Sequence, residues 1–243
     1  MIAIKKGNTP QILLDKQKIA SERNLSSYDA YALLNHSEKV QILNSLMAEQ
    51  GHICAYCMRK IPDERELPPN VDPVTIEHWL PRRPADHIER GQGLDYNNML
   101  AVCSGNRGKR HTRKTKDLTC DAKRSASHPQ LTLNPCNPET IAEIKYKENG
   151  EIYSDNPDIS RDLDVCLNLN CTSSGVDLPK TRKLVLDALQ KSIPDGSVSE
   201  ILTYCKSALE MYESETDPKT PYVGILLWWL QDFIHKLEQT DTQ

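Results

Sequence analysis

The spacing of hydrophobic residues predicts a helix that leads into the first cysteine pair. Between Ser37 and Gly51 the apolar side chains recur at helical intervals, with a serine suited to an N-cap at the start and a glycine at the end. The apolar positions are Val40, Ile42, Leu43, Leu46 and Met47. We therefore expect a helix over residues 37–51 that delivers the chain to Cys54.

The central part of the chain alternates between loops and short extended runs. Prolines and charges over residues 61–74 exclude regular structure and predict a loop between two short strands, of which the second reads "VTIEHW", residues 74–79. Another irregular loop follows over residues 81–96. Residues 97–102 then lead into Cys103, and a basic, glycine-containing excursion separates Cys103 from Cys120.

The pattern changes after Asn134. An Asn-Gly turn predicts a β-hairpin that pairs residues 144–148 with residues 151–154. Helical periodicity follows over residues 159–169, 179–192, 197–212 and 222–237. The last helix carries Trp228, Trp229 and Phe233, which we interpret as core residues. These patterns indicate an α+β fold with an N-terminal arm (1–37), a central core (38–138) and a hairpin plus helical C-terminal lobe (139–243).

Charge is unevenly distributed along the chain. The 243 residues carry a formal net charge of −4, which argues against a protein that coats nucleic acid over its whole surface. Residues 107–124 contain eight Lys or Arg and two Asp, a local charge of +6, so the rest of the chain carries −10. No apolar run reaches the length of a membrane span and no signal-peptide pattern is present, so a cytoplasmic protein is expected.

Four of the eight cysteines have the arrangement of a metal site. Cys54 and Cys57 form a C-x-x-C pair, whose two thiolates can supply half of a tetrahedral zinc site. Cys103 and Cys120 can complete it, although the gap between them is wider than in a usual paired knuckle. Because a cytosolic chain keeps its thiols reduced, we expect structural Zn²⁺ rather than disulfides. No role is expected for Cys136, Cys166, Cys171 and Cys205.

An acid and a histidine stand side by side at the end of the strand over residues 74–79. Side chains alternate along a strand, so Glu77 and His78 point in different directions around the following turn. One can hold a metal ion while the other meets a water molecule. This division of labour suits phosphodiester hydrolysis, in which a divalent ion neutralises oxygen charge and a neutral imidazole accepts a proton.

Four motifs in order, "CAYC", "IEHWLP", "YNNMLAVC" and "CDAKR", resemble the HNH, or ββα-metal, endonuclease family. The resemblance implies a zinc-stapled ββα-metal nuclease core in residues 38–138. It implies structural Zn²⁺ on Cys54, Cys57, Cys103 and Cys120, a catalytic Mg²⁺ or Mn²⁺ on Glu77, and His78 as general base. Asn98 would brace the loop that aims His78.

The second ligand of the catalytic ion has two candidates. In "CSGNRGK" Asn106 stands where a compact HNH knuckle has its second cysteine, and "NRGK" resembles the ligand turn of HNH domains in RNA-guided nucleases. Alternatively, residues 104–119 are an insertion and "CDAKR" supplies Asp121. Asp121 is favoured because it follows the fourth cysteine directly and is an anionic oxygen donor suited to Mg²⁺ or Mn²⁺.

Most of the chain is similar to the PtuB-type HNH proteins of Septu anti-phage systems, some of which belong to retrons. The similarity is carried by "IKKGNTPQILL", the split knuckle, "LTLNPCNPET" and "CLNLN…LPKTRKLVLDAL". It implies a role in antiviral defence and a PtuA-like ABC/SMC-type ATPase as partner. For retron members it also implies a reverse transcriptase with its msDNA.

Basic residues near these motifs are candidates to contact the phosphates of DNA or RNA: Arg82, Arg83, Arg107, Lys109, Arg110, Lys123 and Arg124. The alternative for the basic run is a solvated loop. The alternative for the whole chain is a catalytically silent, zinc-stapled module that binds nucleic acid or a partner. The complete set of acid, histidine, Asn and Asp residues favours the enzyme.

Overall fold

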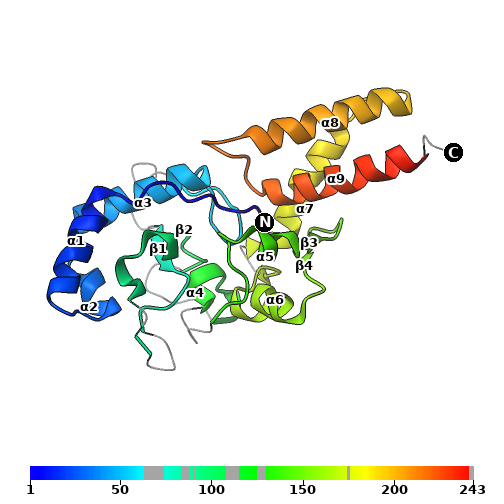
Figure 1. The fold of residues 1–243 in the computed structure, drawn as a ribbon. Coiled ribbons are helices and arrows are strands. Elements are labelled where there is room, and N and C mark those ends of the chain that lie inside the picture. The colour runs from blue at the N-terminus through cyan, green and yellow to red at the C-terminus, as the bar shows by residue number, and fades with distance from the viewer. Residues whose placement is uncertain are drawn as a thin grey trace.

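The structure of the protein is a computed structural model that describes residues 1–62, 74–83, 88–89, 91–107, 115–124, 130–173 and 176–240 (Figure 1). The α-helices are α1 (Gln11–Glu22), α2 (Ser27–Ala32), α3 (His36–Gln50), α4 (Cys120–Arg124), α5 (Pro138–Ala142), α6 (Pro157–Arg161), α7 (Leu178–Ser192), α8 (Val198–Ser214) and α9 (Val223–Thr240). Shorter helical turns are η2 (Gln92–Leu94), η3 (Tyr96–Asn98), η4 (Thr115–Asp117) and the π-helical η5 (Asp162–Cys166).

The strands form small antiparallel sheets. β1 (Thr75–His78) pairs with β2 (Met99–Val102), β3 (Lys145–Tyr146) with β4 (Ile152–Tyr153), and β5 (Thr172–Ser173) with β6 (Val176–Asp177). Helices and short antiparallel sheets together confirm the α+β class. Among the described residues, no helix combines the length and the apolar content that a membrane crossing needs.

Helix α3 confirms the helix predicted before the first cysteine pair, but its N-cap differs. Asn35, not Ser37, caps the helix: its side chain accepts from the Glu38 backbone N–H, and the Glu38 carboxylate accepts from the Asn35 N–H. This reciprocal capping box satisfies two backbone donors, which a serine two residues later would not do. Gly51 ends the helix with φ +64°, a conformation that glycine adopts without strain.

The β1–β2 pair sets the position of the acid-histidine motif. Glu77 lies opposite Leu100, and His78 lies opposite Met99. The far edge of β2 is covered by buried Gln50, whose side-chain amide donates to the Ala101 carbonyl (2.8 Å) and accepts from the Ala101 N–H (2.8 Å). The end of α3 is thereby fixed to β2, and the cysteine turn after α3 is held beside the sheet.

The N-terminal residues, for which the sequence pattern predicted no element, form α1 and α2 and pack on the central residues. The Gln17 side chain donates to the Leu94 carbonyl of η2 (2.9 Å). Glu89 accepts from the Ser27 backbone N–H at the start of α2 (2.9 Å). A Cβ on Gly93 would lie 1.9 Å from the Ser27 carbonyl oxygen, so only glycine allows α2 and η2 to approach this closely.

The C-terminal half follows the predicted order with one difference. The Asn-Gly turn joins β3 and β4, with Gly150 at φ +88°, and α7, α8 and α9 match three predicted helices within a few residues. The remaining predicted helix, over residues 159–169, is replaced by α6 followed by η5. It begins earlier because Asn156 caps it and Pro157 takes its first position. The α-helix changes to the π-helix η5 at Asp162. The buried carboxylate of Asp162 accepts hydrogen bonds from the backbone N–H groups of Thr132 and Leu133.

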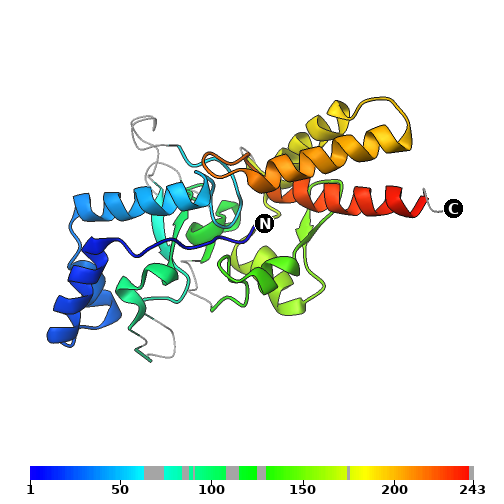
Figure 2. The same ribbon diagram turned by 45° about the horizontal axis from the view of Figure 1, so that its top comes forward.

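One continuous cluster of buried apolar residues runs from the N-terminal segment to α9. Helices α8 and α9 lie against each other and project away from β1 and β2 (Figures 1 and 2). Trp229 is buried and stacks on Phe233, with ring centroids 4.6 Å apart, as expected of core aromatics. The segment before α9 reaches the cysteine turn, because the Tyr222 N–H donates to the Met58 carbonyl (2.9 Å).

Candidate metal centre and acid-histidine cleft

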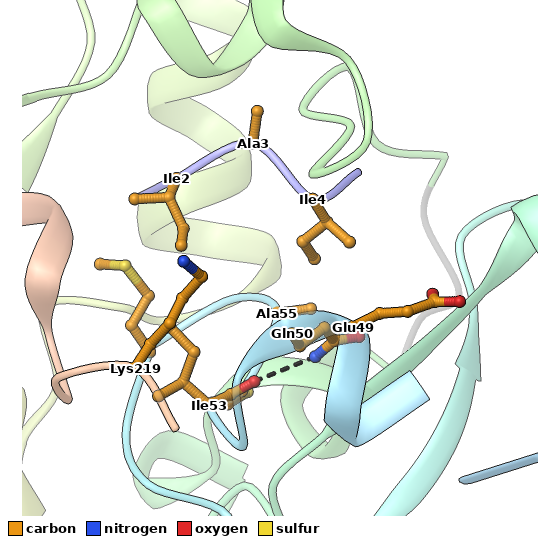
Figure 3. Close-up of a pocket in the computed structure, with 10 residues that line it drawn as sticks. Ile2, Ala3, Ile4, Glu49, Gln50, Ile53, Ala55 and Lys219 are labelled. Carbon is orange, nitrogen blue, oxygen red and sulfur yellow. Dashed lines mark hydrogen bonds between the residues drawn. The ribbon is translucent and has the colours of Figure 1, made fainter. Parts of the chain in front are cut away.

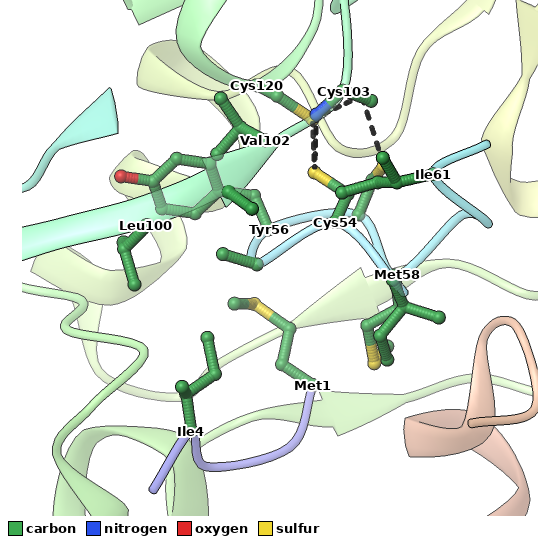
Figure 4. Packing of buried hydrophobic residues seen from close by; sticks show 14 of the residues in the cluster. Met1, Ile4, Cys54, Tyr56, Met58, Ile61, Leu100, Val102, Cys103 and Cys120 are labelled. Carbon is green, nitrogen blue, oxygen red and sulfur yellow. Dashed lines mark hydrogen bonds between the residues drawn. The ribbon is translucent and has the colours of Figure 1, made fainter. Parts of the chain in front are cut away.

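The four cysteines of the predicted zinc site meet in one buried cluster, and Figure 4 shows Cys54, Cys103 and Cys120 directed toward one another at the edge of the core. The Sγ atoms of all four, Cys57 included, lie within 4.8 Å of one another. The Sγ–Sγ distances are 3.9 Å for Cys54–Cys120, 3.7 Å for Cys57–Cys103 and 3.8 Å for Cys103–Cys120.

These distances fit a tetrahedral zinc ion. A Zn–S bond of about 2.3 Å places tetrahedral sulfurs about 3.8 Å apart, whereas a disulfide needs about 2.05 Å. All four residues are free thiols. The cluster therefore has the donor set and the spacing to hold a structural metal such as zinc.

Arg59 supplies positive charge to the cluster. Zn²⁺ with four thiolates carries a net charge of about −2, which burial makes costly. The Arg59 Nε lies 3.3 Å from the Cys57 Sγ, and its Nη1 donates to the Asn106 Oδ1 at 3.0 Å. The Asn106 Nδ2 in turn donates to the Asp117 carbonyl (2.9 Å). Asn106 is thus a support of the metal cluster, with both side-chain atoms already bonded.

Cys120 stands immediately before the residue that reaches the second site. It adopts φ +53° and begins α4, and its backbone N–H donates to the Leu167 carbonyl (2.8 Å). The Asn168 side chain holds the preceding segment through the carbonyls of Lys116 and Leu118. A metal ion on Cys120 would therefore also fix the start of α4, where Asp121 lies.

His78 is buried at the end of β1, in a fixed orientation. Its Nε2 lies 3.0 Å from the Gly93 carbonyl oxygen, an acceptor only, so Nε2 carries the proton and Nδ1 carries the lone pair. The Tyr31 ring packs edge-on against the imidazole at a centroid distance of 4.8 Å. Burial, then the charge of Arg82, lowers the pKa of His78 to about 4. The imidazole is therefore neutral at physiological pH.

Glu77 and Asp121 form a pair of neighbouring carboxyl groups. Burial and the negative charge of Asp121 raise the pKa of Glu77 to about 8, despite an ion pair between Glu77 and Arg124. A cation bound by both carboxyl groups would offset the effect of the Asp121 charge on Glu77, so the two are a suitable pair of ligands. The Tyr56 hydroxyl also lies 3.4 Å from the Glu77 Oε1.

Asn98 joins the end of η3 to the chain that follows β1. Its Oδ1 accepts from the Leu80 N–H (2.7 Å), and its Nδ2 donates to the Leu80 carbonyl (3.0 Å) and the Gln92 carbonyl (3.2 Å). These bonds fix the turn directly after His78 to the segment that carries Gly93. Such a geometry is what a brace for the histidine loop requires.

Glu77, His78 and Asp121 line one cleft of about 490 Å³. Glu77 contacts Arg124 of α4, whereas His78 contacts Gly93 of η2 and Tyr31 of α2. Four arginines also line it: Arg82, Arg83, Arg107 and Arg124. A smaller cavity of about 20 Å³ lies under the N-terminal segment, lined by Ile2, Ile4 and Gln50 (Figure 3). It has room for about one water molecule and is separate from these side chains.

The arginines of the cleft differ in their surroundings. Arg107 lies 3.6 Å from the Asp121 carboxylate. Arg124 was expected to contact phosphate, but it is only 2% exposed and binds Glu77 and the carbonyls of His78 and Trp79. The structure therefore gives Arg124 the role of a brace for β1. Lys123 does not line the cleft, and Lys109 and Arg110 lie outside the described residues.

Two tyrosines of α2 belong to the site and were missed in the sequence. Arg83 lies over the Tyr28 ring at 3.4 Å, and Arg82 lies over the Tyr31 ring at 4.2 Å, measured from guanidinium carbon to ring centroid. Both tyrosines belong to "SSYDAYA", where the serine N-cap and the three-residue spacing of the aromatics indicate a helix with one aromatic face. That signal could have identified α2, but not its position against Arg82 and Arg83.

No protein-family model matches this sequence, and no curated protein matches it either. The residues of the cleft and the sequence resemblance are therefore the basis for assigning a function.

Proposed function

We propose that the protein is a metal-dependent endonuclease of the HNH type, which hydrolyses phosphodiester bonds in nucleic acid. The observation that carries the proposal is the cleft itself. It contains a neutral histidine with a fixed tautomer, two neighbouring carboxyl groups and a basic lining. This is the set of groups that phosphodiester hydrolysis needs, and it is joined to a cluster of cysteines suited to zinc.

The proposed reaction assigns one task to each group. His78 accepts a proton from water at Nδ1, the resulting hydroxide attacks phosphorus, and the bond to the leaving oxygen breaks. A divalent ion such as Mg²⁺ or Mn²⁺, bound by Glu77 and Asp121, would supply positive charge to the phosphoryl and leaving oxygens. Arg82, Arg83 and Arg107 attract and orient the polyanionic strand. Asp121 is the second ligand in this proposal, because Asn106 is bonded to Arg59 and does not line the cleft.

The test is cleavage of plasmid DNA, single-stranded DNA and total RNA by wild type and His78→Ala, with Mg²⁺ or Mn²⁺ present. Loss of a general base slows hydrolysis about 100-fold or more. Zinc content should stay unchanged, because His78 makes no contact with the cysteine cluster. His235→Ala, an exposed histidine of α9, is the matched control and should cut like wild type. Equal cleavage by wild type and His78→Ala would refute the mechanism.

One observation favours the alternative, a catalytically silent binding module. The Glu77 carboxylate is bonded to Arg124, so a divalent cation has to compete with a buried guanidinium for this ligand. Mn²⁺ titration followed by calorimetry separates the two functions. A nuclease should bind Mn²⁺ in the wild type and lose that binding in Asp121→Asn, whereas Asn106→Ser should still bind. A silent module should bind no Mn²⁺ beyond the metal on the cysteines.

Antiviral defence and the PtuA-like ATPase partner, with a reverse transcriptase and msDNA in a retron setting, are proposals supported by the sequence resemblance. Co-expression of the tagged full chain with a PtuA-like ATPase, followed by affinity purification, tests the partner. Recovery of both proteins in a fixed ratio is the expected result. Recovery of the tagged chain alone would contradict it.

A further inference from the structure

A second hollow adjoins the cleft and has no role in the chemistry described above. It measures about 290 Å³ and shares Ile76 with the cleft. Its apolar lining includes Val40 and Leu43 of α3, together with Ile76, and one wall is Tyr31. Tyr31 also packs against His78, so the hollow begins directly beside the histidine.

Two basic side chains lie against Tyr31, the aromatic wall of this hollow. Lys39 lies over the Tyr31 ring at 4.7 Å, and Arg82 lies over the same ring at 4.2 Å. Among the described residues, no carboxylate forms an ion pair with Lys39, Arg82 or Arg83. An anion beside these two cations would be stabilised by their charge.

The combination of surfaces identifies the ligand by its chemistry. The apolar side chains of the hollow can contact the face of a planar ring, and the neighbouring cations can accept a phosphate. A free phosphate would use only the cations. A nucleotide uses both, and its position next to the cleft makes it a neighbour of the cleaved phosphodiester.

We propose that the hollow formed by Tyr31, Lys39, Val40, Leu43 and Ile76 is a subsite for the base of the nucleotide adjoining the cleaved bond. A base that is stacked and paired within a duplex must first unstack and unpair to enter a side pocket, a cost that an unpaired base does not carry. The substrate is therefore a strand that is unpaired at this nucleotide. This inference rests on the proposed nuclease function and specifies its substrate class.

The test is equilibrium binding of a fluorescein-labelled oligonucleotide to the full chain, followed by fluorescence anisotropy without added Mg²⁺ or Mn²⁺. The same sequence is compared as a single strand and as a duplex. One stacked base contributes enough that the single strand should bind about tenfold more tightly than the duplex. Equal binding of the two forms, or no binding of either, would overturn the subsite.

Val40→Trp fills the hollow and leaves the charged side chains and His78 of the cleft unchanged in sequence. It should weaken single-strand binding about tenfold and abolish the preference over duplex. Gln41→Trp places the same side chain at the next, exposed position of α3 and should bind like wild type. An unchanged dissociation constant for Val40→Trp, with the fold and zinc content intact, would overturn the proposal.

Lys39→Gln gives an independent readout of the phosphate contact. In a plot of the logarithm of the binding constant against the logarithm of the salt concentration, the steepness of the slope should fall by about 0.7. This is the value for one phosphate contact on a single strand. An unchanged slope would remove Lys39 from the subsite. The two proposals fail separately: strand preference without any cleavage refutes the nuclease alone, and cleavage without strand preference refutes the base subsite alone.

Discussion

At the scale of single residues, burial explains the chemistry assigned to His78. The residue is 5% exposed, and its ring stays neutral because it is buried and its Nε2 is bonded to a backbone carbonyl rather than to a carboxylate. An aspartate at that place would stabilise the imidazolium and raise the pKa instead. The Gly93 carbonyl orients the ring without charging it.

This environment makes the stability of the protein depend on pH below neutrality. The folded-state pKa of His78, about 4, lies below the ordinary value of 6.5. Between these values the unfolded chain binds a proton that the folded chain does not, so stability falls as pH falls. From pH 7 to pH 5 the loss from this one residue is about 2 kcal/mol.

Urea unfolding of wild type and His78→Gln at pH 7 and pH 5 measures this loss. The difference in free energy of unfolding between the two pH values should be smaller in His78→Gln by about 2 kcal/mol, because glutamine does not titrate. Equal differences in the two proteins would show that His78 gains its proton as readily in the folded state as in the unfolded state.

At the scale of elements, α4 connects the cysteine cluster with the cleft. The helix has five residues and begins with Cys120 of the cysteine cluster, which is next to Asp121 and four residues before Arg124. A helix this short is not stable by itself, so its position depends on what holds its ends. The Arg124 bonds to β1 provide one such constraint, and a metal ion bound at Cys120 would provide another.

Loss of Cys120 should therefore affect the cleft as well as the zinc. Cys120→Ser is expected to lower bound zinc, measured by metal analysis, and to lower the cleavage rate in proportion, because Asp121 loses its fixed position. Cys136→Ser changes a half-buried thiol outside the cluster and should retain both. A Cys120→Ser protein that lost zinc but cut at the wild-type rate would show that α4 is positioned without the metal.

At the scale of the whole molecule, the sequence predicted local features better than long-range ones. Periodicity located α3, α7, α8 and α9, and cysteine spacing led to the metal cluster. Sequence could not show that Gln50 covers the edge of β2, or that α2 brings Tyr28 and Tyr31 to the cleft. These contacts join residues tens of positions apart, and their pairing depends on packing rather than on local pattern.

The same limit applies to Arg124 and Asn106. Both stand in motifs that suggest contact with substrate or metal, and both are used to hold the site together. A sequence gives the type of a side chain but not its partner. The proposed boundary at residue 138 remains a prediction, although bonds from Leu167 and Asn168 to residues 116–120 cross it.

The bonds between the cysteine turn and the segment before α9 have a consequence for biosynthesis. Residues 51 and 58, on either side of Cys54 and Cys57, accept hydrogen bonds from residues 219 and 222. During translation the thiols leave the ribosome long before the residues that enclose them, at about 5–20 residues per second. Nascent chains therefore carry accessible thiols for several seconds. Enclosure of the cysteine turn should therefore be complete only after residues 219 and 222 have left the ribosome.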